Sequence, residues 1–472
     1  MRRSVLLLAA ALSTACQPAA DRRGATVLFA SGADLQSINP LLTQHPLARQ
    51  VQRYVLLTTL ARYDSALVAQ PYLARVWSWS VDRRTLRFVL HPGVRWHDGV
   101  PTTARDAAWT LTAARDPATG YPRLADLADL RDIDAPDDTT LVLGFAHPQS
   151  RFPDVLTDLA LMPAHLLDSI PHAALRRAAW NERPVGNGPF RFVAHEPNRR
   201  WVFAADSSFP AALGGPPRLQ RFIVVVVDEP TTKLAALTSG ELDFAGIQPA
   251  HAEFVRRDPA LTVLTYPLLF TYGIVFNTRR PPFDALDARR AASAAIDRRE
   301  IVDGYLYGYG TPADGPVPPD VPGYLPEPAP PQATRAAARQ AVGVELLTVG
   351  SGEAALEQMV QARLRPAGFT VAIRQLELGA FLSRVYGAHD FDAAVLGISG
   401  DPGLGYLGPL AQLAGMTAPA APDAAQRFFA DSVPVAFLYH ARGLQGMNRR
   451  VRGVVMDLRG ELPTVHDWWV AP

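Results

Sequence analysis

Short apolar runs alternate with helical patterns along this chain, and that alternation restricts it to an α/β fold. Residues 222–227 form a continuous apolar run rich in β-branched side chains, which is typical of a strand buried on both faces. Residues 231–239 then show helical character up to Gly240, and residues 242–244 return to a strand. A strand, a helix and a second strand in this order indicate a parallel crossover.

The same order recurs in the second half of the chain. The patterns there predict a strand at 344–349, a helix at 353–365, a strand at 371–376, a helix at 378–386 and a strand at 392–398. In the first half, a capping pattern at 103–106 begins a predicted amphipathic helix over 103–115. Residues 311–331 contain nine prolines, so we expect an extended surface excursion between two α/β units.

Length and composition exclude several classes of protein. The 472 residues suffice for about three domains of ordinary size. Hydrophobic residues make up 48% and charged residues 19% of the chain, which excludes a disordered chain or a coiled coil. The formal charge of +1 provides no field that would attract nucleic acid. Every basic residue except Lys233 is arginine, which we interpret as compositional bias.

The first 16 residues have the order of an export signal. Two arginines are followed by an apolar run at 5–12 and by small residues that lead into Cys16. The run is too short to span a bilayer, which needs about 20 apolar residues. Residues 12–16 resemble a bacterial lipobox, and this resemblance implies lipid attachment at Cys16 and a tether over 17–26. Cys16 is the only cysteine, so the fold cannot rely on an internal disulfide.

Motifs for bond chemistry are incomplete or absent. Gly350-Ser351-Gly352 lacks the third glycine of a dinucleotide loop, and residues 397–401 end in Asp401 where a nucleophile elbow needs glycine. The 11 histidines include no HExxH pair, and the sequence has no phosphate-binding Walker loop. We therefore predict no enzymatic activity, no cofactor and no metal site.

Residues 94–106, Val-Arg-Trp-His-Asp-Gly-Val-Pro-Thr-Thr-Ala-Arg-Asp, resemble the signature of the family 5 extracellular solute-binding proteins. Other segments resemble the same family, and they occur in the family's order, at 37–40, 71–77, 186–190, 239–243, 276–277, 281–283 and 295–298. The resemblance implies a two-lobed periplasmic-binding-protein fold of class II, of the large cluster C type, with mixed sheets and a hinge of two crossing segments. It places lobe one at 24–265 plus 441–472, a compressed lobe two at 266–440, and the crossings near 265–267 and 438–440.

Asp401 is the strongest candidate for ligand binding, because it follows a predicted strand at the edge where α/β sheets bind their ligands. The resemblance implies that this aspartate pairs with the peptide's ammonium group, as in the peptide-binding members of the family. The backbone of Gly397 and Ser399 would assist it, and Ile398 occupies the place of a family tryptophan. The alternative is that Asp401 is a turn residue before Pro402.

Four further residues are secondary candidates. Ser31 and Gly32 follow the predicted strand 27–30, and Tyr272 and Asn277 flank the first strand of lobe two. Tyr272 could instead be a core residue. The resemblance implies that a dipeptide-binding member would carry an arginine near Ala354 and Ala355 to hold the peptide carboxylate, and this sequence has no arginine there.

The leading hypothesis is a monomeric, lipid-anchored receptor of the cell envelope for peptides or peptide-like solutes. It would deliver its cargo to the permease of an ABC importer that a separate ATPase drives. The alternatives are a receptor for an oligosaccharide, nickel or a metal chelate, or an envelope lipoprotein with a sensing or scaffold role.

Overall fold

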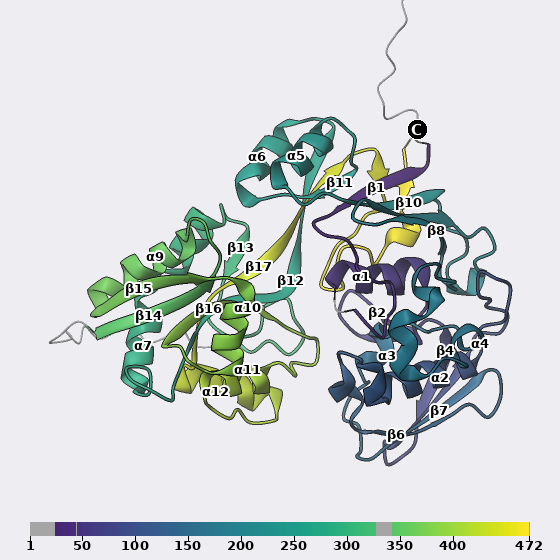
Figure 1. The fold of residues 1–472 in the computed structure, drawn as a ribbon, viewed down its shortest axis with the longest axis horizontal. Coiled ribbons are helices and arrows are strands. Elements are labelled where there is room, and N and C mark those ends of the chain that lie inside the picture. Colours follow the sequence, from purple (N-terminus) through teal and green to yellow (C-terminus); the bar gives the residue numbers. More distant parts are fainter. Residues whose placement is uncertain (1–23, 44, 327–341, 472) are drawn as a thin grey trace, which may run out of the picture.

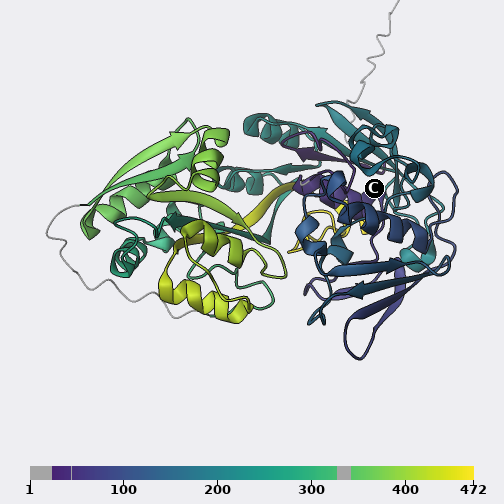
Figure 2. The same cartoon turned by 60° about the horizontal axis from the view of Figure 1, so that its bottom comes forward.

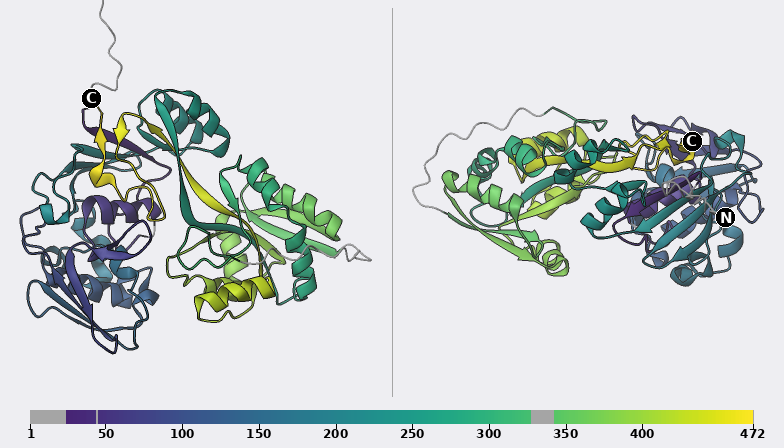
Figure 3. Two further views of the ribbon diagram at one scale, coloured as in Figure 1. Left: turned by 180° about the vertical axis from the view of Figure 1, so that it is seen from behind. Right: turned by 90° about the horizontal axis from the view of Figure 1, so that it is seen from above.

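The structure is a computed structural model that describes residues 24–43, 45–326 and 342–471. Two long strands, β12 (Leu261–Phe276) and β17 (Val435–Asn448), run side by side from one lobe into the other (Figure 1). The same two bodies and the same connection are visible in the other orientations (Figures 2 and 3). The predicted two-lobed α/β fold is therefore confirmed. The predicted signal peptide, Cys16 and most of the tether lie outside the described residues.

A single mixed sheet continues through both lobes. Because β12 and β17 pair antiparallel from Leu261 and Asn448 to Val275 and Val435, they join the strands of lobe two to those of lobe one. The order across the sheet is β15 (Phe369–Leu376), β14 (Val342–Val349), β16 (Ala393–Ser399), β12, β17, β11 (Phe244–Gly246), β1 (Thr26–Ser31), β10 (Arg221–Val226), β9 (Arg200–Ala205) and β8 (Phe190–Glu196), and β13 (Gly310–Pro312) pairs with β17.

The crossover predicted in lobe one is confirmed. Strands β10 and β11 both run parallel to β1, which lies between them, and helix α5 (Pro230–Thr238) connects them. The strand expected at 242–244 instead begins at Phe244. Asp243 precedes it, and its fully buried carboxylate accepts a hydrogen bond from the backbone N–H of Leu28 at 2.9 Å and pairs with Arg450 at 2.6 Å.

Lobe two also has the predicted order. Strand β14 is followed by α9 (Ala355–Leu364), β15, α10 (Leu378–Leu382) with a π-helical turn at Ser383–Gly387, and β16. Strands β15 and β16 both pair parallel with β14, so each helix is a crossover. Two buried clusters of hydrophobic residues fill the lobe on the two faces of this sheet.

The prediction for residues 311–331 was wrong in part. Within the described residues up to 326, Ala313, Val317 and Val321 are buried in the core of lobe two, and Thr311 and Pro312 belong to β13. The prolines prevent a helix here, but the apolar side chains between them still favour burial over exposure to water. The segment is therefore an extended part of the core, and residues 327–331 lie outside the described chain.

The family-like motif at 94–106 has a structural role in lobe one. Thr103 and Asp106 form the predicted capping box at the start of α2 (Ala104–Arg115). The indole N–H of Trp96 donates to Asp106 Oδ2 at 3.3 Å, and the backbone N–H of Ala164 donates to Asp106 Oδ1 at 2.9 Å. Helix α2 packs on a separate sheet whose order is β4 (Ala74–Trp79), β5 (Thr85–Leu90), β7 (Thr140–Phe145) and β6 (Leu130–Asp134).

Shorter elements complete both lobes. In lobe one they are α1 (Pro46–Val51), a π-helical turn (Gln52–Leu56), β2 (Ala61–Tyr63), β3 (Ala69–Pro71), α3 (Val155–Asp158), α4 (Ala164–Leu167), α6 (Ala252–Arg257), β18 (Val451–Arg452) and β19 (Trp469–Val470). In lobe two they are α7 (Leu286–Ala295), α8 (Arg298–Glu300), a π-helical turn (Ile301–Tyr305), α11 (Leu407–Ala414) and α12 (Pro422–Ser432). Within residues 24–43, 45–326 and 342–471, no helix combines the length and apolar character needed to cross a bilayer.

Candidate ligand-binding site

The two hinge strands are held together by an aromatic ring that lies over a glycine. Tyr266 of β12 is the direct cross-strand partner of Gly443 in β17, and a Cβ built on Gly443 would lie 2.0 Å from the ring. The Tyr266 hydroxyl donates to Glu461 Oε1 at 2.7 Å, and Gln445 Nε2 donates to the same oxygen at 2.7 Å. Burial raises the pKa of Glu461, so this carboxyl group favours its protonated form more than an exposed one.

The register of the hinge strands shifts just beyond this contact. Pro267 is paired with Arg442, whereas the next paired residue, Thr271, lies opposite His440. The irregularity lies within the paired stretch of β12 and β17 that joins the two lobes. Interruptions in a ladder of this kind bend a strand locally.

A cavity of about 220 Å³ lies beside this irregularity, with walls from both lobes. Its aromatic part is formed by Tyr272 and Tyr439, whose rings stack with centroids 4.8 Å apart, and by Tyr309. The other lining residues are Ile247, Pro249, Leu306, Ala441, Arg442 and Leu444. Burial raises the pKa of Tyr272 and of Tyr439, so both phenols stay neutral and can donate hydrogen bonds.

Tyr309 connects the cavity to lobe one. It packs against the buried cluster around α5 and α6, and the guanidinium of Arg256 in α6 lies 5.2 Å from the centre of its ring. Ile247 and Pro249 follow β11 directly. A change in the angle between the lobes must therefore change the shape of this cavity.

The Asp401 loop forms a second contact between the lobes. Asp401 Oδ1 accepts from the N–H of Gly405 and Oδ2 accepts from the N–H of Tyr406, both at 3.1 Å, so the carboxylate fixes the turn that leads into α11. A Cβ built on Gly403 in this turn would meet Arg151 and Asp154 of lobe one. The loop that carries Asp401 thus reaches lobe one.

A model of the bacterial extracellular solute-binding proteins, family 5, matches residues 68–414, which is most of the chain. The chain belongs to this family. The di/tripeptide-binding protein 2 of Pseudomonas aeruginosa is 28% identical over an alignment of 445 positions that covers 85% of this chain and 81% of that protein. A candidate ABC transporter peptide-binding protein of Brucella ovis is 31% identical over 243 residues, which are 51% of this chain and only 45% of that relative.

The fold of this family 5 protein is also found among solved structures. The periplasmic binding protein DppA of Helicobacter pylori, in complex with the peptide STSA, superposes with a TM-score of 0.78 at 20% identity. That superposition covers 96% of this chain and 99% of DppA. At this identity the likeness shows the fold.

The predicted site residues on β16 lie on two different faces of the sheet in this family 5 protein. Gly397 is the cross-strand partner of Tyr272 and Ser399 that of Phe270, so the two share the face of the tyrosine cavity. Ile398 points to the opposite face and is buried in the core of lobe two. Its side chain is a core residue, and its backbone alone remains near the candidate site.

The other secondary candidates have separate environments. Ser31 is buried, and its hydroxyl donates to the carbonyl of Ala33 at 2.6 Å. Gly32 is exposed beside the carboxyl end of β1. Asn277 lies five residues beyond Tyr272, and its amide donates to the carbonyls of His389 and Phe391 at 3.0 and 2.9 Å, so it fastens β12 to lobe two.

Sequence reasoning missed two residues that line the cavity, Tyr309 and Tyr439, and one residue beside Gly32, Lys233. Tyr309 and Tyr439 carry no local pattern that distinguishes them from other tyrosines. Lys233 did carry a signal, because it is the only lysine in the chain, but we interpreted that as composition. Its ammonium nitrogen lies beside Gly32, 3.3 Å from a Cβ built there, and it has no ion pair within the part of the chain that the structure describes.

Proposed function

We propose that this protein is the extracytoplasmic receptor of an ABC importer and binds peptides or peptide-like solutes. It passes them to a membrane permease that a separate ATPase drives, and it performs no bond chemistry. Family membership and the relatives named for peptide binding support this proposal. The observation that carries it is the tyrosine-lined cavity at the hinge, whose walls come from both lobes.

The chemistry of this cavity suits part of a peptide. Stacked tyrosines provide a flat apolar surface for a side chain, and their hydroxyls and nearby backbone groups provide hydrogen bonds that orient the ligand. We propose that Asp401 accepts the ligand's ammonium group, since each carboxylate oxygen retains a lone pair beyond its bond to the turn. Gly397 and Ser399 would add backbone contacts, and Ser31 and Gly32 would form the facing wall on lobe one.

Lys233 is a candidate for the opposite end of the ligand. Its ammonium group lies beside Gly32 and could pair with a peptide carboxylate in place of the arginine that is missing near residue 354. Asn277 and the side chain of Ile398 are not included in this proposal, because both are engaged within lobe two.

The hinge and the lobe boundaries form part of the proposal. We place the hinge at residues 265–271 and 438–443, where the strand register shifts. The lobe boundaries near residues 265 and 440 that the sequence predicts are kept in this proposal. The protein would act as a monomer attached to the membrane through a lipid on Cys16. Metabolic labelling with a fatty acid tests the anchor, because a Cys16→Ser variant should lose the label.

Mass spectrometry of ligands that copurify with the protein is the first test of function. Titration calorimetry with dipeptides, tripeptides, sugars and nickel chelates then compares the solute classes directly. We expect a peptide to bind, and we expect Asp401→Asn to weaken free-amine peptides at least tenfold more than N-acetylated ones. Binding of sugars or chelates without peptides would refute the peptide assignment, and equal losses for both peptide forms would refute the role of Asp401.

A further inference from the structure

Three arginines of lobe one surround a single buried aspartate. Asp158, the last residue of α3, pairs with Arg49 of α1 and with Arg53 of the following π-helical turn. It also accepts from Arg123 Nη1 at 2.7 Å. Burial by itself would raise the pKa of Asp158, but the three guanidinium groups together hold it well below its ordinary value. The carboxylate is therefore ionised throughout the physiological pH range.

This cluster retains an excess of positive charge. Arg123 is shared with Asp126, which accepts from Arg123 Nε at 2.6 Å. Three guanidinium groups thus face two carboxylates. Each arginine contacts Asp158, but the cluster as a whole carries one more positive than negative charge, and its arginine side chains are only 18 to 34% exposed.

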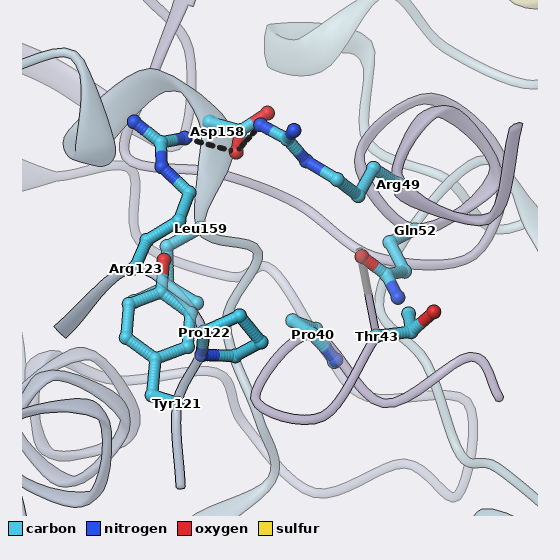
Figure 4. Close-up of a pocket in the computed structure, with 9 residues that line it drawn as sticks. All are labelled: Pro40, Thr43, Arg49, Gln52, Tyr121, Pro122, Arg123, Asp158 and Leu159. Atoms are coloured by element: carbon cyan, nitrogen blue, oxygen red, sulfur yellow. Dashed lines mark hydrogen bonds and ion pairs between the residues drawn. The ribbon is translucent and has the colours of Figure 1, made fainter. Parts of the chain in front are cut away.

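A small cavity of about 60 Å³ lies directly against the cluster. In Figure 4, Arg49 and Gln52 lie on one side of it, Arg123 and Tyr121 on the other, and Asp158 at one end. The remaining lining residues are Pro40, Thr43, Pro122 and Leu159. Among the described residues, Asp158 is the only carboxylate that lines the cavity, and its charge is already neutralised by the arginines.

The wall of this cavity also contains an unused hydrogen-bond donor. Gln52 is 2% exposed, and its Nε2 has no hydrogen-bond partner within the described residues. A buried donor without an acceptor costs about 1–3 kcal/mol, so such groups normally bind a partner. An acceptor bound in the cavity within reach of both Gln52 Nε2 and a guanidinium group would satisfy the unused donor and offset the excess charge.

We propose that this cavity binds a small inorganic oxyanion of the size of phosphate or sulfate. Oxyanion oxygens accept charge-assisted hydrogen bonds from guanidinium groups, and such groups bind these anions in many proteins. The bound anion would join two segments that are distant in sequence, namely α1 with the turn after it, through Arg49 and Gln52, and residues 121–123, through Arg123. It would stabilise lobe one without taking part in solute binding at the hinge.

Calorimetric titration and thermal unfolding of the purified protein with phosphate, sulfate, acetate and chloride at constant ionic strength test this proposal. We expect saturable binding of one phosphate or sulfate per chain and a rise in Tm that follows occupancy. Acetate and chloride should have little effect, and an acetate response equal to that of phosphate would mean that the cavity takes carboxylates instead and would overturn the inorganic assignment.

Two variants locate the binding. Gln52→Leu and Arg49→Gln should each weaken phosphate binding at least tenfold. Arg199→Gln is the matched control, because Arg199 is an exposed arginine that also pairs with a carboxylate, Glu196. Binding by the Gln52→Leu variant equal to that of the parent would overturn the proposal even if Arg49→Gln fails to fold. Peptide titration of Gln52→Leu should be unchanged, which separates this site from the proposed function.

Discussion

Replacement of Gly443 by alanine tests whether the hinge depends on the close approach of Tyr266. The added Cβ would lie 2.0 Å from Cζ of the Tyr266 ring, whereas ordinary contact begins at 3.4 Å. The ring must therefore retreat by about 1.4 Å, and Tyr266 and Gly443 are both buried. Overpacking of this kind costs about 1–3 kcal/mol.

A second cost follows from the hydroxyl of the same ring. The Tyr266 hydroxyl donates to Glu461 Oε1 at 2.7 Å, and a displacement of that size breaks the bond. A lost hydrogen bond contributes about 0.5–1.5 kcal/mol. We expect Gly443→Ala to lower the free energy of unfolding by about 2–4 kcal/mol in all.

Urea unfolding followed by circular dichroism measures this loss as a lower midpoint at constant slope. Gly343→Ala is the matched control, because Gly343 also lies in a strand and a Cβ built on it meets nothing within 4 Å. The double variant Gly443→Ala with Tyr266→Leu should lose much less than the sum of the two single losses. Equal midpoints for the Gly443 and Gly343 variants would refute the reasoning.

Three further predictions follow from individual charges. Lys233→Gln should weaken binding of peptides with a free carboxylate by about fivefold to tenfold and leave C-amidated peptides unchanged in calorimetric titrations, and equal effects on both would exclude the carboxylate role. Burial raises the pKa of Glu461 above its ordinary value of 4.5, so the folded state keeps its proton longer than the unfolded state, and stability falls as pH rises from about 4.5 through the raised pKa. Glu461→Gln should flatten that slope in urea midpoints measured from pH 4 to 8, whereas the exposed Glu253→Gln should retain it. Asp158→Asn should cost about 3–5 kcal/mol in the same assay, because it leaves three partly buried arginines without their shared carboxylate, and a loss below about 1 kcal/mol would contradict that account.

The sequence predicted those features that depend on neighbours along the chain. The capping box at Thr103 and Asp106, the crossover through α5 and the alternation from β14 to β16 all follow from local periodicity and start or stop signals. Their bounds were correct to within about two residues. The family pattern near residues 94–106 then indicated the two-lobed fold, which local signals alone do not specify.

The candidate site depended on contacts between distant segments. Ile398 and Gly397 are adjacent in sequence, but the pairing of β16 with β12 directs one to the core and the other to the tyrosine face. A shift of one residue in that register would exchange them, and no local pattern fixes it. The same limit applied to residues 311–326, where prolines indicated an exposed segment and the apolar side chains between them were buried.

The sequence by itself therefore determined the α/β class, the order of the elements and the family, because these follow from side-chain periodicity and from motifs a few residues long. Only the tertiary structure decided which side chains meet. The tyrosine cavity combines residues from 247 to 444, and the arginine cluster combines residues from 49 to 158. Such groups form when long-range strand pairing and packing bring distant segments together. The free energy of that packing depends on the whole folded chain, so no local stretch of sequence indicates it.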